Sequence, residues 1–317
     1  MILRLFFALF FLLVVPCVYA AELPGIPQFI EEMVNKHPFK RDELAQIFRR
    51  ADRRQAVIDA ISAPATLKPW AEYRATFVND QRINGGLQFW QLYAEALQRA
   101  ENQYGVPQEI IVALIGVETV YGRNAGKYLT LDALTTLAFD YPRRAEFFRG
   151  ELEQFLLLTR EQELDIFKVQ GSYAGALGIP QFMPSSYRKH AVDFSGNGKI
   201  DLMHDPVDAI GSVANYLKQY GWKNGLAVAN HVGVSEENCV GSLAEVHTVA
   251  EWAAAGVKPS QEIPADLQAR LIDFTVADGK EFWLAFANFD VITRYNNSDF
   301  YAMSVFQLAE ALRGAHH

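Results

Sequence analysis

The sequence predicts an α+β fold that is predominantly helical. Apolar residues recur at helical spacing through the first two thirds of the chain, and short β-leaning runs begin only after Gly221. A last helical segment follows these runs, so the β-containing part is expected to be inserted in a helical body. The chain has 317 residues, of which 50% are hydrophobic, so a sizeable core can form and a disordered or fibrous protein is excluded.

The first twenty residues, 1–20, have the pattern of a secretory signal with predicted cleavage after Ala20. The apolar run is shorter than the roughly 20 residues of a membrane span, although a permanent N-terminal anchor remains an alternative. A lipoprotein anchored at Cys17 is a second alternative, which the preceding Pro16 disfavours. We therefore expect an exported, periplasmic protein. Cleavage would leave Cys239 as the single cysteine, which excludes an intramolecular disulfide.

Glycine and proline residues divide the rest of the chain. Asn84-Gly85-Gly86 is expected to interrupt a helical pattern, and Gly105-Val106-Pro107 to end one helix and begin the next. The predicted regions are an N-terminal helical region at 21–106, a core at 107–222, a small mixed segment at 223–294 and a C-terminal helix within 295–317. The core helices are predicted at 107–120, 130–140, 143–161, 184–191 and 205–220. The mixed segment has β-leaning runs at 226–232, 271–276 and 282–289 and a helical piece around 242–254, and the last helix runs from about Ser298 to Arg313.

The net charge of the chain does not indicate a binding partner. Lysines and arginines number 29 and acidic residues 37, which gives a net charge of −8 without a long basic run. This argues against nucleic-acid binding, which depends on neutralising phosphates.

One acidic residue lies on an apolar helical stripe. The segment 107–121 places Glu118 in line with Leu114 and Ile115 by three- and four-residue spacing. Burial without a cation would raise the pKa of this carboxyl toward neutrality, as a general acid requires. The alternatives are a solvated carboxylate or one paired with Arg123, Arg143 or Arg144.

The motifs around Glu118 resemble those of a known family. Glu-Thr-Val-Tyr-Gly begins at Glu118, Gly-Ser-Tyr-Ala-Gly-Ala at Gly171 and Gln-Phe-Met-Pro-Ser at Gln181, and Trp-Ala-Glu-Tyr-Arg at Trp70 and Ile-Thr-Arg-Tyr-Asn at Ile292 extend the likeness. In their order along the chain they resemble the lytic murein transglycosylase B family, glycoside hydrolase family 103, over nearly all of the mature chain. The resemblance implies a lysozyme-like catalytic core.

The resemblance also implies an activity: cleavage of the β-1,4 bond of peptidoglycan between N-acetylmuramic acid and N-acetylglucosamine, leaving a 1,6-anhydromuramoyl end. Glu118 would act first as acid and then as base. A hydrolase would need a second carboxylate across the bond, for which Asp132 and Asp140 are the nearest downstream candidates. A muramidase that uses water, and a peptidoglycan-binding protein that does not cut, are the alternatives.

The same resemblance assigns a set of substrate-binding residues. Ser172 matches a serine that hydrogen-bonds an N-acetyl group, and amide and aromatic side chains suit a neutral sugar. The remaining matched positions are Gln181, Tyr73, Tyr216, Tyr295 and Asn296. Arg143 and Arg144 are candidates for the peptide-bearing side of the substrate, although two arginines opening a helix usually form a solvated surface.

The segment from Asp193 has the spacing of a calcium loop. Oxygen-bearing side chains stand at Asp193, Ser195, Asn197 and Asp201, and the carbonyl of Lys199 fills the seventh position.

Position 12 of this loop is His204 instead of glutamate, so an EF-hand match is incomplete. The family resemblance supplies Asp208 as the last ligand. A structural calcium ion is therefore expected, with a metal-free turn as the alternative, and no cofactor is expected for the chemistry. The expected partners are peptidoglycan glycan strands, with cell-wall synthesis proteins as further candidates and no nucleic acid. We expect a monomer.

Overall fold

The computed structural model describes residues 23–63, 68–234 and 245–316. The predicted signal and Cys17 lie outside these residues, as does Cys239. No helix in the described part of the chain is long and apolar enough to cross a membrane.

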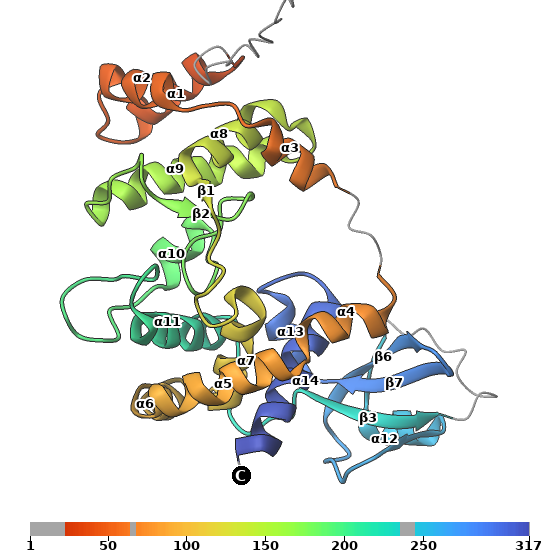
Figure 1. Ribbon diagram of the computed structural model, residues 1–317. Helices are drawn as coiled ribbons and strands as arrows, with labels where there is room; N and C mark the ends of the chain where they lie inside the picture. Colours follow the sequence, from red (N-terminus) through yellow and green to blue (C-terminus); the bar gives the residue numbers. More distant parts are fainter. Residues whose placement is uncertain (1–22, 64–67, 235–244, 317) are drawn as a thin grey trace, which may run out of the picture.

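In the described part of the chain, six helices precede the core. They are α1 (Ile26–Lys36), α2 (Arg41–Arg50), α3 (Gln55–Ser62), α4 (Trp70–Phe77), α5 (Asp80–Leu92) and α6 (Ala94–Tyr104). They divide into two groups in space: α3 contacts α8, whereas α4 and α5 contact the C-terminal helix. Figure 1 shows α1 and α2 beside α8 and α9 at one end of the molecule and α4 to α6 along the other side.

The central helix α7 (Gln108–Thr119) is buried almost along its whole length. The other core helices are α8 (Thr130–Asp140), α9 (Ala145–Glu161), α10 (Pro184–His190) and α11 (Pro206–Gln219), with a 3-10 turn at Pro142–Arg144. A two-stranded antiparallel ladder, β1 (Tyr128–Leu129) with β2 (Gln170–Gly171), joins the α7–α8 connection to the loop that precedes α10. The five predicted core helices are thus confirmed to within two residues at each end.

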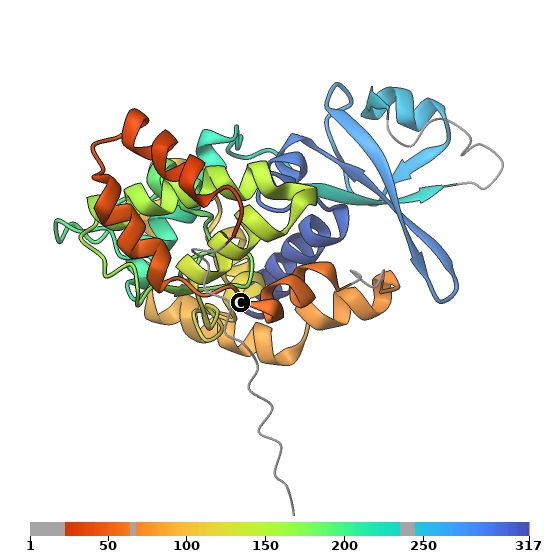
Figure 2. The same cartoon turned by 90° about the horizontal axis from the view of Figure 1, so that it is seen from above.

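A five-stranded antiparallel sheet in the order β4-β6-β7-β3-β5 follows α11. Its elements are β3 (Ala229–Val234), β4 (Val246–Thr248), α12 (Val249–Ala254), β5 (Val257–Pro259), β6 (Gln268–Val276) and β7 (Gly279–Ala285). Alternate side chains face opposite sides, so Leu271 and Leu284 pack with Trp252 of α12, while Ile272 and Phe274 join the core of the helical body. Figure 2 shows α12 on the outer side of the sheet.

The chain then returns to the helical body through α13 (Ala287–Thr293) and α14 (Asp299–His316). α14 packs along α7 and also contacts α4 and α5, so the sheet is inserted between two parts of one helical body (Figure 1). The predominantly helical α+β class is confirmed. The region boundaries stay predictions.

Three local predictions were wrong. The run 282–289 is not one strand, because β7 ends at Ala285 and α13 begins at Ala287. The piece 242–254 contains β4 before its helix. Asn84-Gly85-Gly86 does not interrupt a helix but lies inside α5, where the absence of side chains at the glycines lets another residue approach.

That residue is Tyr121. A β-carbon at Gly86 would lie 2.5 Å from the Tyr121 hydroxyl oxygen, and one at Gly116 would lie 2.7 Å from its Cζ. Because both glycines lack a β-carbon, the Tyr121 hydroxyl fits between them and donates to the carbonyl of Arg82 over 2.7 Å. Gly86 and Gly116 thus let one tyrosine tie α5 to the end of α7.

Candidate functional site

Glu118 stands in the last turn of α7, just before an unusual change of chain direction. Val120 and Tyr121 both have left-handed backbone conformations, with φ of 52° and 62°. The preceding Thr119 holds this turn, since its hydroxyl donates to the carbonyl of Ile179 over 2.8 Å and accepts from the N–H of Gly122 over 2.9 Å. The turn therefore fixes Glu118 beside the loop that follows β2.

The carboxyl group of Glu118 has a neutral hydrogen-bond partner. The hydroxyl of Tyr301 on α14 donates to Oε1 over 2.5 Å. Burial raises the pKa of Glu118 to about 7, although the Tyr301 hydrogen bond acts in the opposite direction. A carboxyl with this pKa can both hold and release a proton near neutral pH.

No arginine pairs with Glu118 among the ion pairs of the described residues. Arg123 instead donates to the carbonyl of Val120. Arg143 and Arg144 are exposed in the 3-10 turn, where the Arg144 guanidinium lies 4.3 Å from the ring centre of Phe147. The alternative of a salt-bridged carboxylate does not apply in this structure.

Four tyrosines gather around the carboxyl. Tyr295 and Tyr301 stack with ring centres 6.5 Å apart, and Tyr216 lies 4.8 Å from Tyr295. The negative charge of Glu118 helps burial to raise the pKa of Tyr295 and Tyr301, and it has the same secondary effect on Tyr73 of α4. Three of the four were predicted from sequence.

Tyr301 was not predicted. It lies six residues after Tyr295, and no spacing rule connects it to Glu118, 183 residues earlier. The signal that could have found it is the amphipathic pattern of the last helix, which places Tyr301 on the same apolar face as Val305 and Leu308.

The other tyrosine hydroxyls fix the loops around the site. Tyr295 donates to the carbonyl of Pro180 over 2.5 Å, and Tyr216 donates to the carbonyl of Arg294 over 2.7 Å. The loops that carry Gln181 and Asn296 are therefore attached to the same aromatic cluster.

Ser172 and Gln181 belong to the loop between β2 and α10. The Ser172 hydroxyl oxygen accepts the N–H groups of Ala174 and Ala176 over 3.2 and 3.0 Å. Gln181 has a left-handed φ of 52°, and its amide donates to the carbonyls of Ala125 and Gly178. Both side chains thus shape the loop, and each keeps further hydrogen-bonding capacity: the Ser172 proton and the Gln181 carbonyl.

The two candidates for a second carboxylate are hydrogen-bonded to other parts of the protein. Asp132 accepts from the side chain of Arg54 and from the N–H of Asp52, and Asp140 accepts from Arg53. They attach the α2–α3 connection to α8. Asn296 is exposed, and the structure gives its side chain no contact with Glu118.

The predicted calcium loop is folded around two carboxylates. Asp193 accepts the N–H groups of Gly196, Asn197 and Gly198. The fully buried Asp208 lies at the start of α11 and accepts from three backbone N–H groups of the loop, those of Phe194, Ser195 and Asp201.

The donor set of this loop is mixed. No cluster of three or more His, Cys, Asp or Glu side chains suited to a metal occurs in the described parts of the chain. The loop instead offers the Asp193 and Asp208 carboxylates with hydroxyl, amide and carbonyl oxygens from Ser195, Asn197 and Lys199, which is the hard-oxygen chemistry that Ca²⁺ prefers. Asp193 Oδ2 and Asp208 Oδ2 each accept one N–H, so each retains a lone pair.

Comparisons with known proteins show the family of the chain. The model of the Transglycosylase SLT domain family matches residues 22–310. Membrane-bound lytic murein transglycosylase B of Escherichia coli is 47% identical over 302 residues, which are 92% of this chain and 83% of that protein.

Solved structures match the fold as well. The soluble lytic transglycosylase SltB1 from Pseudomonas aeruginosa has a TM-score of 0.87 at 47% identity, covering 92% of this chain and 99% of that one. Lytic transglycosylase Slt35 of Escherichia coli, solved in complex with calcium, has a TM-score of 0.87 at 46% identity, covering 93% and 94%. The chain belongs to the lytic murein transglycosylase B family, whose members are enzymes that act on peptidoglycan.

Proposed function

We propose that this lytic transglycosylase cleaves the β-1,4 bond between N-acetylmuramic acid and N-acetylglucosamine with Glu118 as its one acid and base. The observation that carries the proposal is the carboxyl of Glu118 itself, which has a pKa of about 7 and a neutral partner in Tyr301. Near neutral pH such a group is protonated in a large fraction of molecules. It can therefore donate a proton that an ordinary glutamate would already have lost.

The proposed reaction has two proton transfers. The Glu118 carboxyl gives its proton to the glycosidic oxygen as the bond from that oxygen to C1 of the muramoyl residue breaks. The resulting carboxylate then takes the proton of the C6 hydroxyl as the C6 oxygen bonds to C1. The product is a 1,6-anhydromuramoyl end, no water is added, and Glu118 is protonated again.

This mechanism needs one carboxylate, and the surroundings of Glu118 support it. Among the residues that the structure describes, no other acidic side chain shifts the pKa of Glu118. Asp132 and Asp140 are bonded to arginines of the α2–α3 connection. A muramidase mechanism would require a second carboxylate about 5–9.5 Å from the first across the bond.

We further propose that the loops around Glu118 bind the sugar rings. The free Ser172 proton would bond an N-acetyl oxygen, and the Gln181 carbonyl would accept from a sugar hydroxyl or amide. The partly exposed Tyr73 and Tyr295 would supply ring surfaces against which pyranose rings pack, whereas Tyr216 is buried and would support the ring of Tyr295.

Asn296, Arg143 and Arg144 are proposed to contact the substrate at the edge of the site. Asn296 follows directly on Tyr295 in the chain, and its exposed amide can bond sugar hydroxyls. The two exposed arginines would meet the carboxylates of the peptide-bearing side.

A structural calcium ion is proposed in the loop 193–208. The ligands would be Asp193, Ser195, Asn197, the Lys199 carbonyl and Asp208, and a relative solved with calcium supports the assignment. The ion would brace the loop between α10 and α11 without touching the bond that breaks. Calcium should raise the melting temperature of the chelator-treated protein, and Asp193→Asn should remove this effect; equal responses in both proteins would contradict the site.

We propose export to the periplasm with cleavage after Ala20, where the enzyme would act as a monomer on glycan strands, with cell-wall synthesis proteins as further partners. A relative described as membrane-bound supports an exported protein. The mass of the protein isolated from the periplasm would test the cleavage. A mass that retains residues 1–20, or that carries lipid on Cys17, would contradict it.

The activity itself is tested by mass spectrometry of the soluble products from purified murein sacculi. Anhydromuramoyl products are expected, lighter by one water than hydrolysed ends, and they should be absent with Glu118→Gln. Hydrolysed ends would instead support the muramidase, and soluble products from Glu118→Gln would overturn the role of Glu118.

A further inference from the structure

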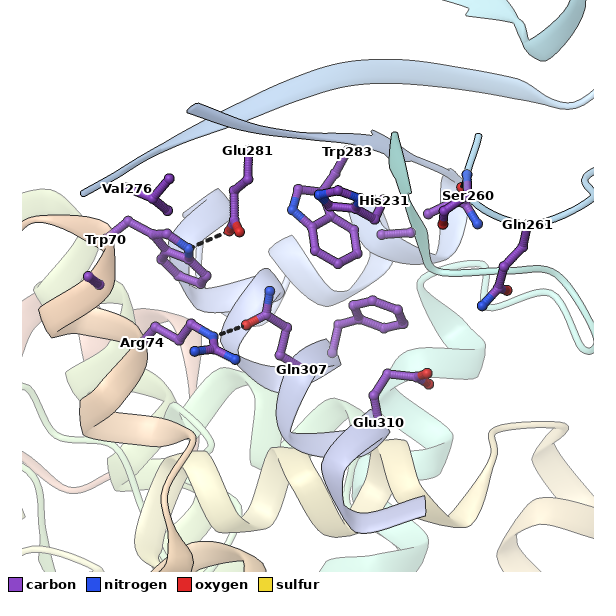
Figure 3. A pocket seen from close by; sticks show the side chains of 14 residues that line it. Trp70, Arg74, His231, Ser260, Gln261, Val276, Glu281, Trp283, Gln307 and Glu310 are labelled. Carbon is purple, nitrogen blue, oxygen red and sulfur yellow. Dashed lines mark hydrogen bonds between the residues drawn. The ribbon is translucent and has the colours of Figure 1, made fainter. Parts of the chain in front are cut away.

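A pocket of about 530 Å³ lies between the sheet and the helical body. Figure 3 shows side chains converging on it from three sides: the inner face of the sheet, α4 and α14. The lining includes Trp70, Arg74, Trp283, Phe306, Gln307 and Glu310. Its volume falls in the ~300–1,000 Å³ range of small-ligand sites.

This pocket is separate from the Glu118 site, although both use the same helices. Tyr301 reaches Glu118, whereas Glu310, nine residues later on α14, lines the pocket. Nine residues at 3.6 per turn make two and a half turns, so the two side chains leave opposite faces of α14. On α4, Trp70 and Arg74 line the pocket, while Tyr73 is the residue affected by the charge of Glu118.

The pocket offers aromatic surface. The Trp283 ring of β7 is only partly buried and meets the Phe306 ring of α14 edge-on, with centres 6.1 Å apart. His231, directly across the ladder from Trp283, meets it edge-on at 5.0 Å. Partly exposed rings in a concave site suit the apolar faces of sugar rings.

The charged side chains of the pocket have partners within the protein. Glu281 accepts from the Trp70 indole over 2.6 Å, Arg74 donates to Gln307, and Glu310 pairs with Arg313. Among the lining residues, the charged side chains are Arg74, Glu281 and Glu310, and each already has a hydrogen-bond or ion-pair partner within the protein. Burial also raises the pKa of Glu310, while Arg313 lowers it and Glu109 adds to the rise. A neutral ligand therefore fits the pocket better than a charged one.

Neutral hydrogen-bonding groups complete the lining. Gln307 accepts from Arg74 and keeps its amide N–H groups, and the exposed Gln261 has a whole amide to offer. Figure 3 shows Gln261 pointing into the pocket from the side opposite Arg74. The buried Trp283 indole N–H has no hydrogen-bond acceptor in the described structure, so it is a sensitive reporter of any change at this wall.

We propose that this pocket is a second binding site for a neutral strand of β-1,4-linked N-acetylated amino sugars. The inference rests on the proposed function, because peptidoglycan is the polymer that presents such strands to this enzyme. Since the pocket and Glu118 lie on opposite faces of α14, the second site would hold a neighbouring strand. Two attachment points raise the effective concentration of enzyme at the polymer without altering the bond-breaking site.

The test uses the full mature chain with Glu118→Gln and chitotetraose as the probe. The indole N–H signal of Trp283 is followed by ¹⁵N nuclear magnetic resonance and identified by its loss in Trp283→Phe. A saturable shift of this signal is expected. Adding Gln261→Ala and Gln307→Ala should raise the Kd read from this signal by about fivefold or more. The control is Gln28→Ala, at an exposed position of α1, which should leave that Kd unchanged.

Two outcomes would overturn the second site. One is a Trp283 signal that stays still when calorimetry shows chitotetraose binding to be saturated, or that gives one Kd in all variants. The other is a shift caused by the free stem peptide and not by the sugar, which would make the pocket a peptide site. Failure of the proposed function has a different signature, since sacculi would then yield no anhydromuramoyl products from the wild-type chain whatever the Trp283 signal does.

Discussion

The ends of two core helices hold acids with opposite surroundings, the partly buried Glu118 and the fully buried Asp208. At the end of α7, Glu118 meets one tyrosine hydroxyl among aromatic rings. At the start of α11, Asp208 accepts three backbone N–H groups from the loop that it closes. The N–H groups attach Asp208 to the loop, whereas Glu118, with its single neutral partner in an apolar setting, keeps its proton to higher pH. The surroundings, and not burial alone, separate a reactive acid from a structural one.

The largest expected effect is on activity at Glu118. Glu118→Gln keeps the size of the side chain and removes its proton, so the rate of release of anhydromuramoyl products should fall by about 10³-fold or more. The control is Glu109→Gln, the same change in the first turn of α7, which should keep most of the activity. Equal losses of activity in Glu118→Gln and Glu109→Gln would contradict the catalytic role of Glu118.

Asp208→Asn should instead lower stability. The change removes the negative charge of the carboxylate to which three N–H groups donate, so the free energy of unfolding should fall by about 2–4 kcal/mol. Urea unfolding in the presence of a chelator measures this loss separately from metal binding. Asp266→Asn, at an exposed position, should change the value by less than about 0.5 kcal/mol.

The corresponding change at Glu118 should have the opposite sign. The pKa of Glu118 is about 7 in the folded chain against an ordinary 4.5, so the folded state binds the extra proton and wild-type stability falls as pH rises between these values. Glu118→Gln escapes this loss. The variant should match the wild type near pH 4 and exceed it by up to about 3 kcal/mol at pH 8. A constant difference across this pH range would contradict the raised pKa.

The smallest effect is expected from Tyr301→Phe. Its hydroxyl lowers the pKa of Glu118, so its removal should raise that pKa above 7 and move the alkaline limb of the pH–rate profile to higher pH. We expect at most about a tenfold loss of rate, because the acid itself remains. Tyr104→Phe, which packs on Phe194 away from Glu118, should leave the profile in place. If the alkaline limb of the Tyr301→Phe profile stays at the wild-type pH, this hydrogen bond does not set the pKa that controls the rate.

The sequence by itself determined the helical class, the five core helices and the apolar stripe that carries Glu118. These depend on local spacing of apolar residues and on glycine and proline, which act within a few residues of chain. The family resemblance also proposes Asp208 as the last ligand of the calcium loop. The same local rules failed at Gly85-Gly86, because the reason for those glycines is Tyr121, which is distant in sequence and close only in the fold.

Only the tertiary structure decided which groups surround each acid. Tyr301 reaches Glu118 across 183 residues, and Asp132 meets Arg54 across 78, so neither partner follows from spacing along the chain. The pocket beneath the sheet likewise exists because the chain leaves the helical body after α11 and returns with α14. A pKa depends on solvent exclusion and on neighbouring charges, both of which are properties of the packed molecule.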